Sequence, residues 1–400
     1  MNCIQKISQD IYWVGGNDRR LERFENMFPI PNGVCYNSYL IVDEKTALID
    51  TVDVSISALF FDNITHVLNG RNLDYLIINH MEPDHCGNIE EIVKRYPSVR
   101  IVGNKKTFQF LEQFYDYDCK NNYLEINEGD KLSLGEHQLK FYYAPMVHWP
   151  EVMFTYEEKE KILFSADAFG TFGALSGNIF SDETDFNTVF LEEARRYYAN
   201  IVGKYGGQVQ SVLKKLSPFE IKMICPLHGP VWRKNLPFIL EKYDYWSKYK
   251  PEKNGVVLVY ASMYGNTENV MNVIASKLAF KGITDMRIYD VSKTHPSYII
   301  SDLWKYSHFI VGSPTYNMGL YYGMESLLRE LEALQFQNRK VSIVGNYTWS
   351  CKSTAIMQEM LSKMKNIEII GKPFELKSTM KREQEEALEN LVDEFYQSII

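Results

Sequence analysis

The chain changes its structural rhythm near residue 250, and this change limits the folds that it can adopt. Before that point, short strand-like runs separated by turns predict stacked sheets with helices outside. The stretch 248–255 is polar and contains Pro and Gly, which is typical of a linker. After it, strand, turn and helix patterns alternate, which is typical of a doubly wound parallel sheet. We therefore expect an α/β protein with two domains, 1–250 and 255–400.

The first part is expected to be rich in strands, with helices around residues 93–96 and a long helical segment at 184–216. The expected strands are 11–14, 39–42, 46–49, 75–79, 139–143, 152–156, 162–164 and 221–224. In the second part we expect strands at 256–260, 285–289, 308–311 and 340–344, and helices at 268–280, 324–334 and 381–396.

The composition excludes several classes of function. A net charge of −8, from 43 Lys and Arg against 51 Asp and Glu, argues against nucleic acid or an anionic membrane as partner. No apolar run is long enough to span a bilayer, and the start lacks the apolar core of a secretion signal, so we expect a cytoplasmic protein. The 6 cysteines include no C-x-x-C pair, which disfavours a disulfide framework, a zinc ribbon or an iron–sulfur site.

Potential metal ligands are concentrated directly after the expected strand 75–79. His80, Glu82, Asp84 and His85 lie within one short run. In an extended segment the first three would point to one side, and Pro83 disfavours a helix here. The expected partners each follow another apolar run: His148, Asp167 and His228. Any one of these residues alone is better explained as a hydrogen-bonded polar residue at a strand end, but the ordered set favours a metal site.

The pattern His80-x-Glu82-x-Asp84-His85 resembles the metallo-β-lactamase superfamily, whose hydrolases usually carry His-x-His-x-Asp-His. A carboxylate in place of an imidazole makes the site harder and more anionic, which favours iron over zinc. The whole set is similar to that of the flavodiiron protein family. This resemblance implies an N-terminal metallo-β-lactamase-like αββα sandwich and a C-terminal flavodoxin-like sheet.

The resemblance also implies the roles of the ligands. His80, Glu82 and His148 would hold one iron of a diiron centre. Asp84, His85 and His228 would hold the other, and Asp167 would bridge the two. All of these except His85 are also the expected catalytic residues, because the position of His85 does not ligate iron in every member. Trp149, Phe169 and Phe172 are expected either to line the pocket or to serve as ordinary core residues.

Three loops of the second part each follow an expected strand of the parallel sheet. The carboxyl ends of such strands are where nucleotides bind, and free N–H groups at a helix N-terminus bind phosphate. Loops of this kind also serve as plain helix caps. The candidate residues are Ser262, Met263, Tyr264, Gly265, Asn266 and Thr267 in the first loop, Ser313, Pro314, Thr315, Tyr316 and Asn317 in the second, and Gly345, Asn346, Tyr347, Thr348, Trp349 and Ser350 in the third.

This half resembles flavodoxin, which implies FMN as cofactor. The third loop departs from the Gly-Ser-Tyr-Gly-Trp-Ser-Gly-Gly of flavodiiron proteins: Asn346 replaces Ser, Thr348 replaces Gly, and Cys351 and Lys352 replace the final glycines. We expect FMN binding to survive these changes.

By resemblance, the protein is expected to reduce dioxygen to water, nitric oxide to nitrous oxide, or both, at irons that FMN re-reduces. A head-to-tail homodimer, or a tetramer that contains such dimers, would bring the flavin of one subunit to the irons of the other. No C-x-x-C pair follows residue 352, so we expect no fused rubredoxin domain. Electrons would then come from a separate donor such as rubredoxin or a flavin reductase.

Two other functions are compatible with parts of this pattern. The first is a zinc-dependent hydrolase of the metallo-β-lactamase or glyoxalase type with an appended flavodoxin-like domain. The second is an electron carrier in which only the flavodoxin-like half is active. Glu82 and the nucleotide loops argue against the hydrolase.

Overall fold

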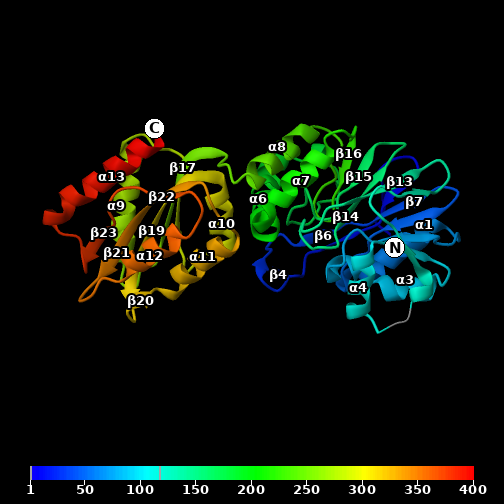
Figure 1. Ribbon diagram of the computed structural model, residues 1–400, viewed down its shortest axis with the longest axis horizontal. Helices are drawn as coiled ribbons and strands as arrows, with labels where there is room; N and C mark the ends of the chain where they lie inside the picture. Colours follow the sequence, from blue (N-terminus) through cyan, green and yellow to red (C-terminus); the bar gives the residue numbers. More distant parts are fainter. Residues whose placement is uncertain (1, 117–118) are drawn as a thin grey trace. The chain divides into compact units, whose positions relative to one another are not determined.

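The computed structural model describes residues 2–116 and 119–400. The chain divides into two compact units: Met1–Tyr198 with Gly207–Asp244, and Ala199–Gly206 with Tyr245–Ile400. Both units are α/β (Figure 1), so the predicted fold class is confirmed. The second unit begins before the expected linker and includes a short earlier segment. The division of the chain at 250–255 stays a prediction.

The first unit contains two main sheets. One has the order β1-β2-β7-β8-β9-β10-β11, and the other has the order β12-β13-β14-β15-β16. The strands of the first sheet are β1 Gln5–Lys6, β2 Ile11–Trp13, β7 Tyr39–Val42, β8 Thr46–Ile49, β9 Tyr75–Ile77, β10 Arg100–Gly103 and β11 Tyr123–Glu125. Those of the second are β12 Lys131–Ser133, β13 Gln138–Tyr143, β14 Met153–Glu157, β15 Ile162–Phe164 and β16 Met223–Cys225.

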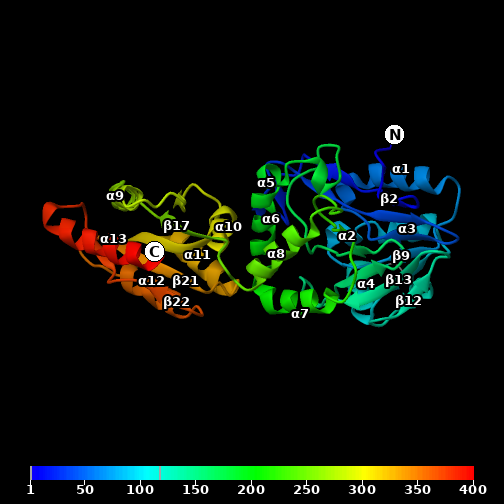
Figure 2. The same ribbon diagram turned by 90° about the horizontal axis from the view of Figure 1, so that it is seen from above.

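Helices (Figure 2) and two small antiparallel sheets of two strands each complete this unit. The strand pairs are β3 Gly16–Asp18 with β6 Val34–Tyr36, and β4 Arg23–Phe24 with β5 Phe28–Pro29. The helices that begin in it are α1 Ser57–Leu68, α2 Pro83–Cys86, α3 Ile89–Arg95, α4 Lys105–Phe114, α5 Phe186–Val189, α6 Leu191–Tyr197 and α8 Leu236–Ser247. The segment 184–216, expected as one long helix, is instead divided into α5, α6, a π-helical turn Tyr198–Val202, a 3-10 turn Gly203–Tyr205 and α7 Gly206–Leu216. The paired glycines Gly206 and Gly207 lower helix propensity at the last of these junctions.

The second unit is built on one parallel sheet with the order β18-β17-β19-β21-β22, which is the flavodoxin-like order. Its strands are β17 Lys253–Tyr260, β18 Met286–Asp290, β19 Tyr306–Tyr316, β21 Arg339–Tyr347, β22 Ile367–Ile369 and β23 Phe374–Lys377, with β20 Gly319–Leu320 antiparallel to β19. Its helices are α9 Asn266–Phe280, α10 Pro296–Lys305, α11 Tyr322–Ala333, α12 Ser353–Ser362 and α13 Glu385–Ile399. Because β17 begins at Lys253, the last residues of the expected linker belong to the sheet.

The core of the second unit follows from alternation along β17. Val256, Leu258 and Tyr260 point to one face, where they pack with apolar residues of α9 and α13 such as Ile274 and Phe395. This packing holds the carboxyl end of β17 and the start of α9 in place. The first nucleotide loop lies between them.

Within the described residues, none of the helices is both long and apolar enough to cross a membrane.

His308, at the start of β19, makes the stability of the second unit depend on pH. Its Nε2–H donates to the carbonyl oxygen of Ser398 at 3.0 Å, and the Ser307 hydroxyl donates to its Nδ1 at 2.7 Å, so the ring is neutral. Burial, reinforced by the charges of Lys340 and Arg339, lowers the pKa of His308 from its ordinary value of 6.5 to about 4. The unfolded chain therefore binds a proton more readily, and stability is lost as pH falls from 6.5 towards 4.

We expect wild-type protein to lose up to about 3 kcal/mol more than His308→Gln over this range, because glutamine does not titrate. Urea unfolding of both proteins at several pH values, followed by tryptophan fluorescence, measures the difference. Equal losses in the two proteins would show that His308 does not carry the effect.

Candidate metal centre

The structure brings all seven predicted ligands together in the first unit, and all seven are buried. They lie after β9, in and before α2, between β13 and β14, after β15 and after β16: His80, Glu82, Asp84, His85, His148, Asp167 and His228. The two sheets contribute from their strand ends, as the sequence pattern predicts. Whether these residues bind metal stays a prediction.

The local conformation of the first motif differs from the expected extended segment. Helix α2 begins at Pro83, and Glu82 is its N-cap residue with extended backbone. Proline is well accepted at the first helical position, because the missing N–H has no partner inside the helix and φ is already suitable. Asp84 and His85 therefore reach the cluster from a helical turn rather than from a strand.

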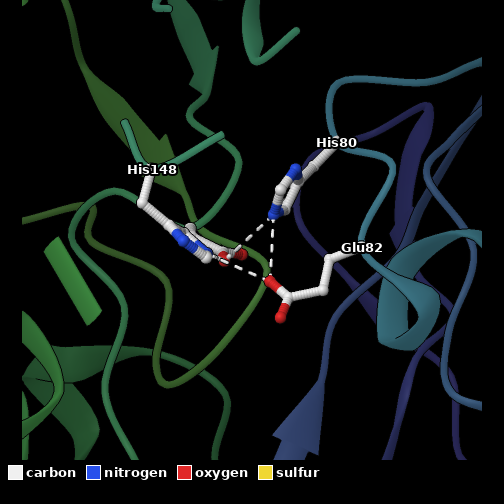
Figure 3. Close-up of side chains that lie close together, drawn as sticks. His80, Glu82 and His148 are labelled. Carbon is white, nitrogen blue, oxygen red and sulfur yellow. Dashed lines mark hydrogen bonds and ion pairs between the residues drawn. The ribbon is translucent and has the colours of Figure 1, made fainter. Parts of the chain in front are cut away.

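One group consists of His80, Glu82, His148 and Asp167. The Glu82 Oε2 atom lies 3.1 Å from His80 Nε2 and 3.0 Å from His148 Nε2. The Asp167 Oδ2 atom lies 3.1 Å from His148 Nε2 and 3.5 Å from His80 Nε2. In Figure 3 the side chains of His80, Glu82 and His148 point toward one common place.

The other group consists of Asp84, His85 and His228. Here the Nε2 atoms of the two imidazoles are 3.0 Å apart, and Asp84 Oδ2 lies 3.3 Å from His85 Nε2 and 3.2 Å from His228 Nε2. Within the described residues, neither carboxylate oxygen of Asp84 has a hydrogen-bond partner. Buried nitrogen and oxygen atoms that lie close together without satisfying one another's hydrogen-bonding capacity are typical of a metal site.

Asp167 is shared by the two groups. Its Oδ2 atom faces the first group, and its Oδ1 atom lies 3.1 Å from His85 Nε2 in the second. One carboxylate thus offers one oxygen to each group, which is the arrangement of a bridging ligand.

The charges in the cluster are strongly coupled. Burial opposes ionisation of Asp167, but His85, His80 and His148 outweigh it and hold the pKa of this carboxyl well below its usual value. Burial likewise opposes ionisation of Glu82, while hydrogen bonds from His148 and His80 lower its pKa. The carboxylates of Asp167 and Glu82 therefore stay charged.

Two buried acids that the sequence interpretation missed support the ligands. Glu151 Oε1 lies 2.8 Å from His80 Nδ1, and Asp50 Oδ1 accepts the N–H groups of Asn79 and His80 at 2.7 and 3.1 Å. Burial raises the pKa of Asp50 to about 7. Asp50 directly follows the apolar strand β8, so the pattern that identified Asp167 also contained this signal.

Aromatic rings surround the cluster. Trp149 lies with its ring centroid 5.4 Å from that of His80, and Phe24, which the sequence interpretation missed, lies 5.2 Å from His228. Phe172 packs on Phe24 rather than on a ligand, and Phe169 packs on Tyr243. Tyr197, also missed, has its ring 5.6 Å from His228. Its buried hydroxyl has no hydrogen-bond partner in the part of the chain that the structure describes.

The nucleotide loops surround a cavity of about 610 Å³ in the second unit. Of the predicted residues, only Gly265, Ser313 and Gly345 do not line it. The residues that line it are Ser262, Met263, Tyr264, Asn266, Thr267, Pro314, Thr315, Tyr316, Asn317, Met318, Asn346, Tyr347, Thr348, Trp349, Ser350 and Ser378. Ser378 was missed because it follows β23, which carries no loop motif.

The three predicted residues outside the lining shape the loops instead. Gly265 has φ +85° at the start of α9, a conformation that favours glycine. A Cβ at Gly345 would lie 2.4 Å from Thr354 Cγ2, and Ser313 is fully buried. Ser262 Oγ accepts the N–H of Gly265 at 3.1 Å and that of Glu268, in the first turn of α9, at 3.3 Å. Trp349 and Tyr264 are 87% and 91% exposed, so their rings are free to cover a ligand.

Two parts of the chain match known protein families. Residues 34–229 match the ODP family beta lactamase, and residues 258–390 match flavodoxin. A nitric oxide reductase of Moorella thermoacetica is 32% identical over 370 residues, which cover 92% of this chain and 91% of that protein.

Solved structures agree with these matches. Rubredoxin oxygen:oxidoreductase of Desulfovibrio gigas superposes with a TM-score of 0.93 at 30% identity, over 99% of this chain and 98% of that one. The flavodiiron protein of Giardia intestinalis gives a TM-score of 0.92 at 26% identity with the same coverage. Since both the sequence and the complete two-unit chain match such proteins, this chain belongs to the flavodiiron protein family.

Proposed function

We propose that this protein reduces dioxygen to water, nitric oxide to nitrous oxide, or both, at a diiron centre that FMN re-reduces. The observation that carries the proposal is Asp167, whose two oxygens face two separate groups of ligands. The names of its relatives support both gases, since one is a nitric oxide reductase and another a rubredoxin oxygen:oxidoreductase.

The donor set fits iron. Four imidazoles and three carboxylates make a site with more hard oxygen donors than the histidine-rich zinc sites of hydrolases. In this proposal His80, Glu82 and His148 hold one ion, Asp84, His85 and His228 hold the other, and Asp167 bridges them. Within the described residues the oxygens of Asp84 make no hydrogen bond, although Oδ2 lies close to two imidazoles, and this agrees with a ligand role.

The cavity of the second unit fits FMN. Its lining combines the hydroxyl and amide groups of Ser262, Thr267 and Asn346 with the rings of Tyr316 and Trp349. We propose that the loop 262–267, at the N-terminus of α9, receives the phosphate, because the N-terminus of a helix attracts an anion. The aromatic side chains would cover the flavin ring.

When bound, the two ferrous ions and the reduced flavin supply the four electrons that reduction of dioxygen to water requires. The side chains of this chain prepare the place where that happens. Asp167 keeps the two positions together, and the rings of Trp149 and Phe24 limit the access of water to the imidazoles. We propose that the Tyr197 hydroxyl, which has no hydrogen-bond partner among the described residues, donates a hydrogen bond to a substrate oxygen. Burial and the charges of Asp167, Glu82 and Asp84 raise the pKa of Tyr197, so it keeps its proton.

Tyr197→Phe tests this hydrogen bond. We expect gas reduction to slow about 10-fold, because one hydrogen bond is lost from the transition state. Iron content should not change, because the hydroxyl touches no ligand. The matched control is Tyr142→Phe, which also removes a buried tyrosine hydroxyl but lies outside the cluster, where its ring packs against Phe219. Equal rates in Tyr197→Phe and wild type would contradict the role.

The decisive experiment is anaerobic turnover of protein loaded with iron and FMN, using a chemical reductant and each gas separately. We expect two irons per chain, one FMN, and consumption of at least one gas without release of peroxide. A chain that binds zinc and no flavin, and that consumes neither gas, would instead support the hydrolase.

We further propose a head-to-tail dimer supplied with electrons by a separate donor. Dilution should then lower the specific activity once the dimer dissociates, because the flavin of one subunit would no longer reach the irons of another. Full activity in a strictly monomeric protein would contradict the dimer.

A further inference from the structure

The outer ring nitrogens of the clustered histidines have unequal partners. His80 Nδ1 meets a carboxylate, Glu151 Oε1, at 2.8 Å. His228 Nδ1 meets a neutral carbonyl, that of Cys35, also at 2.8 Å. His85 Nδ1 is buried with no hydrogen-bond partner among the described residues. Of these three imidazoles, only His80 donates to a charged group.

Glu151 is held firmly for this contact. Its side chain is fully buried, and Oε1 also accepts the N–H of Met81 at 2.9 Å. Its backbone carbonyl accepts a hydrogen bond from the side chain of Asn104 at 2.6 Å, and Asn104 in turn caps helix α4. The carboxylate therefore has a fixed place behind His80, on the side away from the other ligands.

Among the described residues, the second carboxylate oxygen of Glu151 makes no hydrogen bond that would offset its charge. Within the described chain, Oε2 is buried and has no hydrogen-bond partner. A buried carboxylate with one bare oxygen is costly unless positive charge lies close to it. A metal ion on the other ring nitrogen of His80 would supply that charge through the imidazole.

We propose that Glu151 is a positioning residue that makes the ion position of His80, Glu82 and His148 the tighter of the two. A carboxylate that accepts the proton of the outer ring nitrogen fixes the orientation of the imidazole and makes its other nitrogen a stronger metal ligand. A neutral carbonyl has a smaller effect, and an imidazole without such a partner gains nothing. This inference rests on the proposed two-ion site. It adds that the two positions differ in affinity and that one residue outside the ligand set causes the difference.

The test is titration of the metal-free protein with Co²⁺, followed by calorimetry and by visible absorption. We expect two binding events in the wild type. In Glu151→Gln, which keeps the shape and removes the charge, the tighter event should weaken 10- to 100-fold, about what an outer partner contributes. The weaker event should not change.

The chain offers a matched control in Glu157→Gln. Glu157 is also a fully buried glutamate, and its Oε1 lies 3.1 Å from His137 Nδ1, outside the cluster. Glu157→Gln should leave both Co²⁺-binding events unchanged. This control separates the loss of a buried charge in general from the loss of the contact between Glu151 and His80.

Two further backgrounds assign the affected event. In protein that already carries Asp84→Ala, adding Glu151→Gln should weaken the one Co²⁺-binding event that remains. In protein that already carries Glu82→Ala, adding Glu151→Gln should leave the remaining event unchanged. If Glu151→Gln does not fold, as judged by circular dichroism, Glu151→Asp takes its place. Its shorter side chain no longer reaches His80 Nδ1, so it should weaken the same event.

Equal weakening of both events, no weakening, or weakening in the Glu82→Ala background would each overturn the inference. These outcomes are independent of the proposed function, because Co²⁺ binding is measured without turnover. If the protein consumes neither gas but Glu151→Gln selectively weakens one Co²⁺-binding event, the proposed function is contradicted and the inference about Glu151 stands. If the protein reduces a gas but Glu151→Gln leaves Co²⁺ binding unchanged, the proposed function stands and the inference is contradicted.

Discussion

Replacing Asp167 with alanine is expected to remove iron from both positions and to lower gas reduction by at least about 1000-fold, or about 4 kcal/mol. The reason is geometric: Oδ2 of Asp167 faces His148, and Oδ1 faces His85. No other residue of the cluster belongs to both groups. Glu82→Ala, by contrast, removes a ligand from one group only, so we expect it to retain about one iron per chain.

Iron content per chain, measured beside the rate with each gas, distinguishes these cases. Asp393→Ala is a suitable control, since this half-exposed carboxylate lies in α13, outside the cluster. It should leave iron and rate unchanged. Two irons retained in Asp167→Ala would show that Asp167 is not shared.

Replacing Arg339 with alanine is expected to destabilise the second unit by at least about 3 kcal/mol. The guanidinium is fully buried, and burial lowers its pKa to about 9. It donates to six backbone carbonyls. These belong to Leu303, Trp304, Tyr306, Tyr249, Gln337 and Asn338. Alanine would leave several of these acceptors buried without donors at the C-terminus of α10, where a cation is also favoured by the helix dipole.

Urea unfolding followed by FMN fluorescence measures the loss. We expect FMN to be released at a lower urea concentration, while the iron of the first unit is retained. Arg339→Lys should recover little of the stability, because an ammonium group does not reproduce the planar fork of donors. Full recovery with lysine would show that charge alone, and not the hydrogen-bond geometry, matters at this position.

The nucleotide loops were predictable because parallel strands place their carboxyl ends along one edge of a sheet. Most of the residues proposed there line one cavity, although three separate stretches of sequence supply them. Ser378 was not predictable, because its approach depends on the pairing of β23 with β21. Gly345 does not line this cavity, and its lack of a side chain accommodates Thr354.

The local structure around Pro83 shows a different limit. The sequence contains both an extended pattern and a proline, and each disfavours a helix interior. In the fold, Glu82 has an extended backbone and caps the helix, so Pro83 takes the first helical position, where proline is tolerated. A local rule therefore selected residues that the fold brings together, but it predicted their backbone conformation incorrectly.

The sequence by itself determined the order and chemical type of the clustered residues. A polar residue that directly follows a buried strand lies at the end of that strand, and therefore at the edge of the sheet. The sequence also determined the parallel sheet of the second unit through the alternation of strand and helix. The tertiary structure alone decided which oxygen of Asp167 faces which histidine, and that Glu151, Phe24 and Tyr197 surround them. Those contacts join segments that are distant in the chain. Their distances depend on how two sheets pack, which no local pattern encodes.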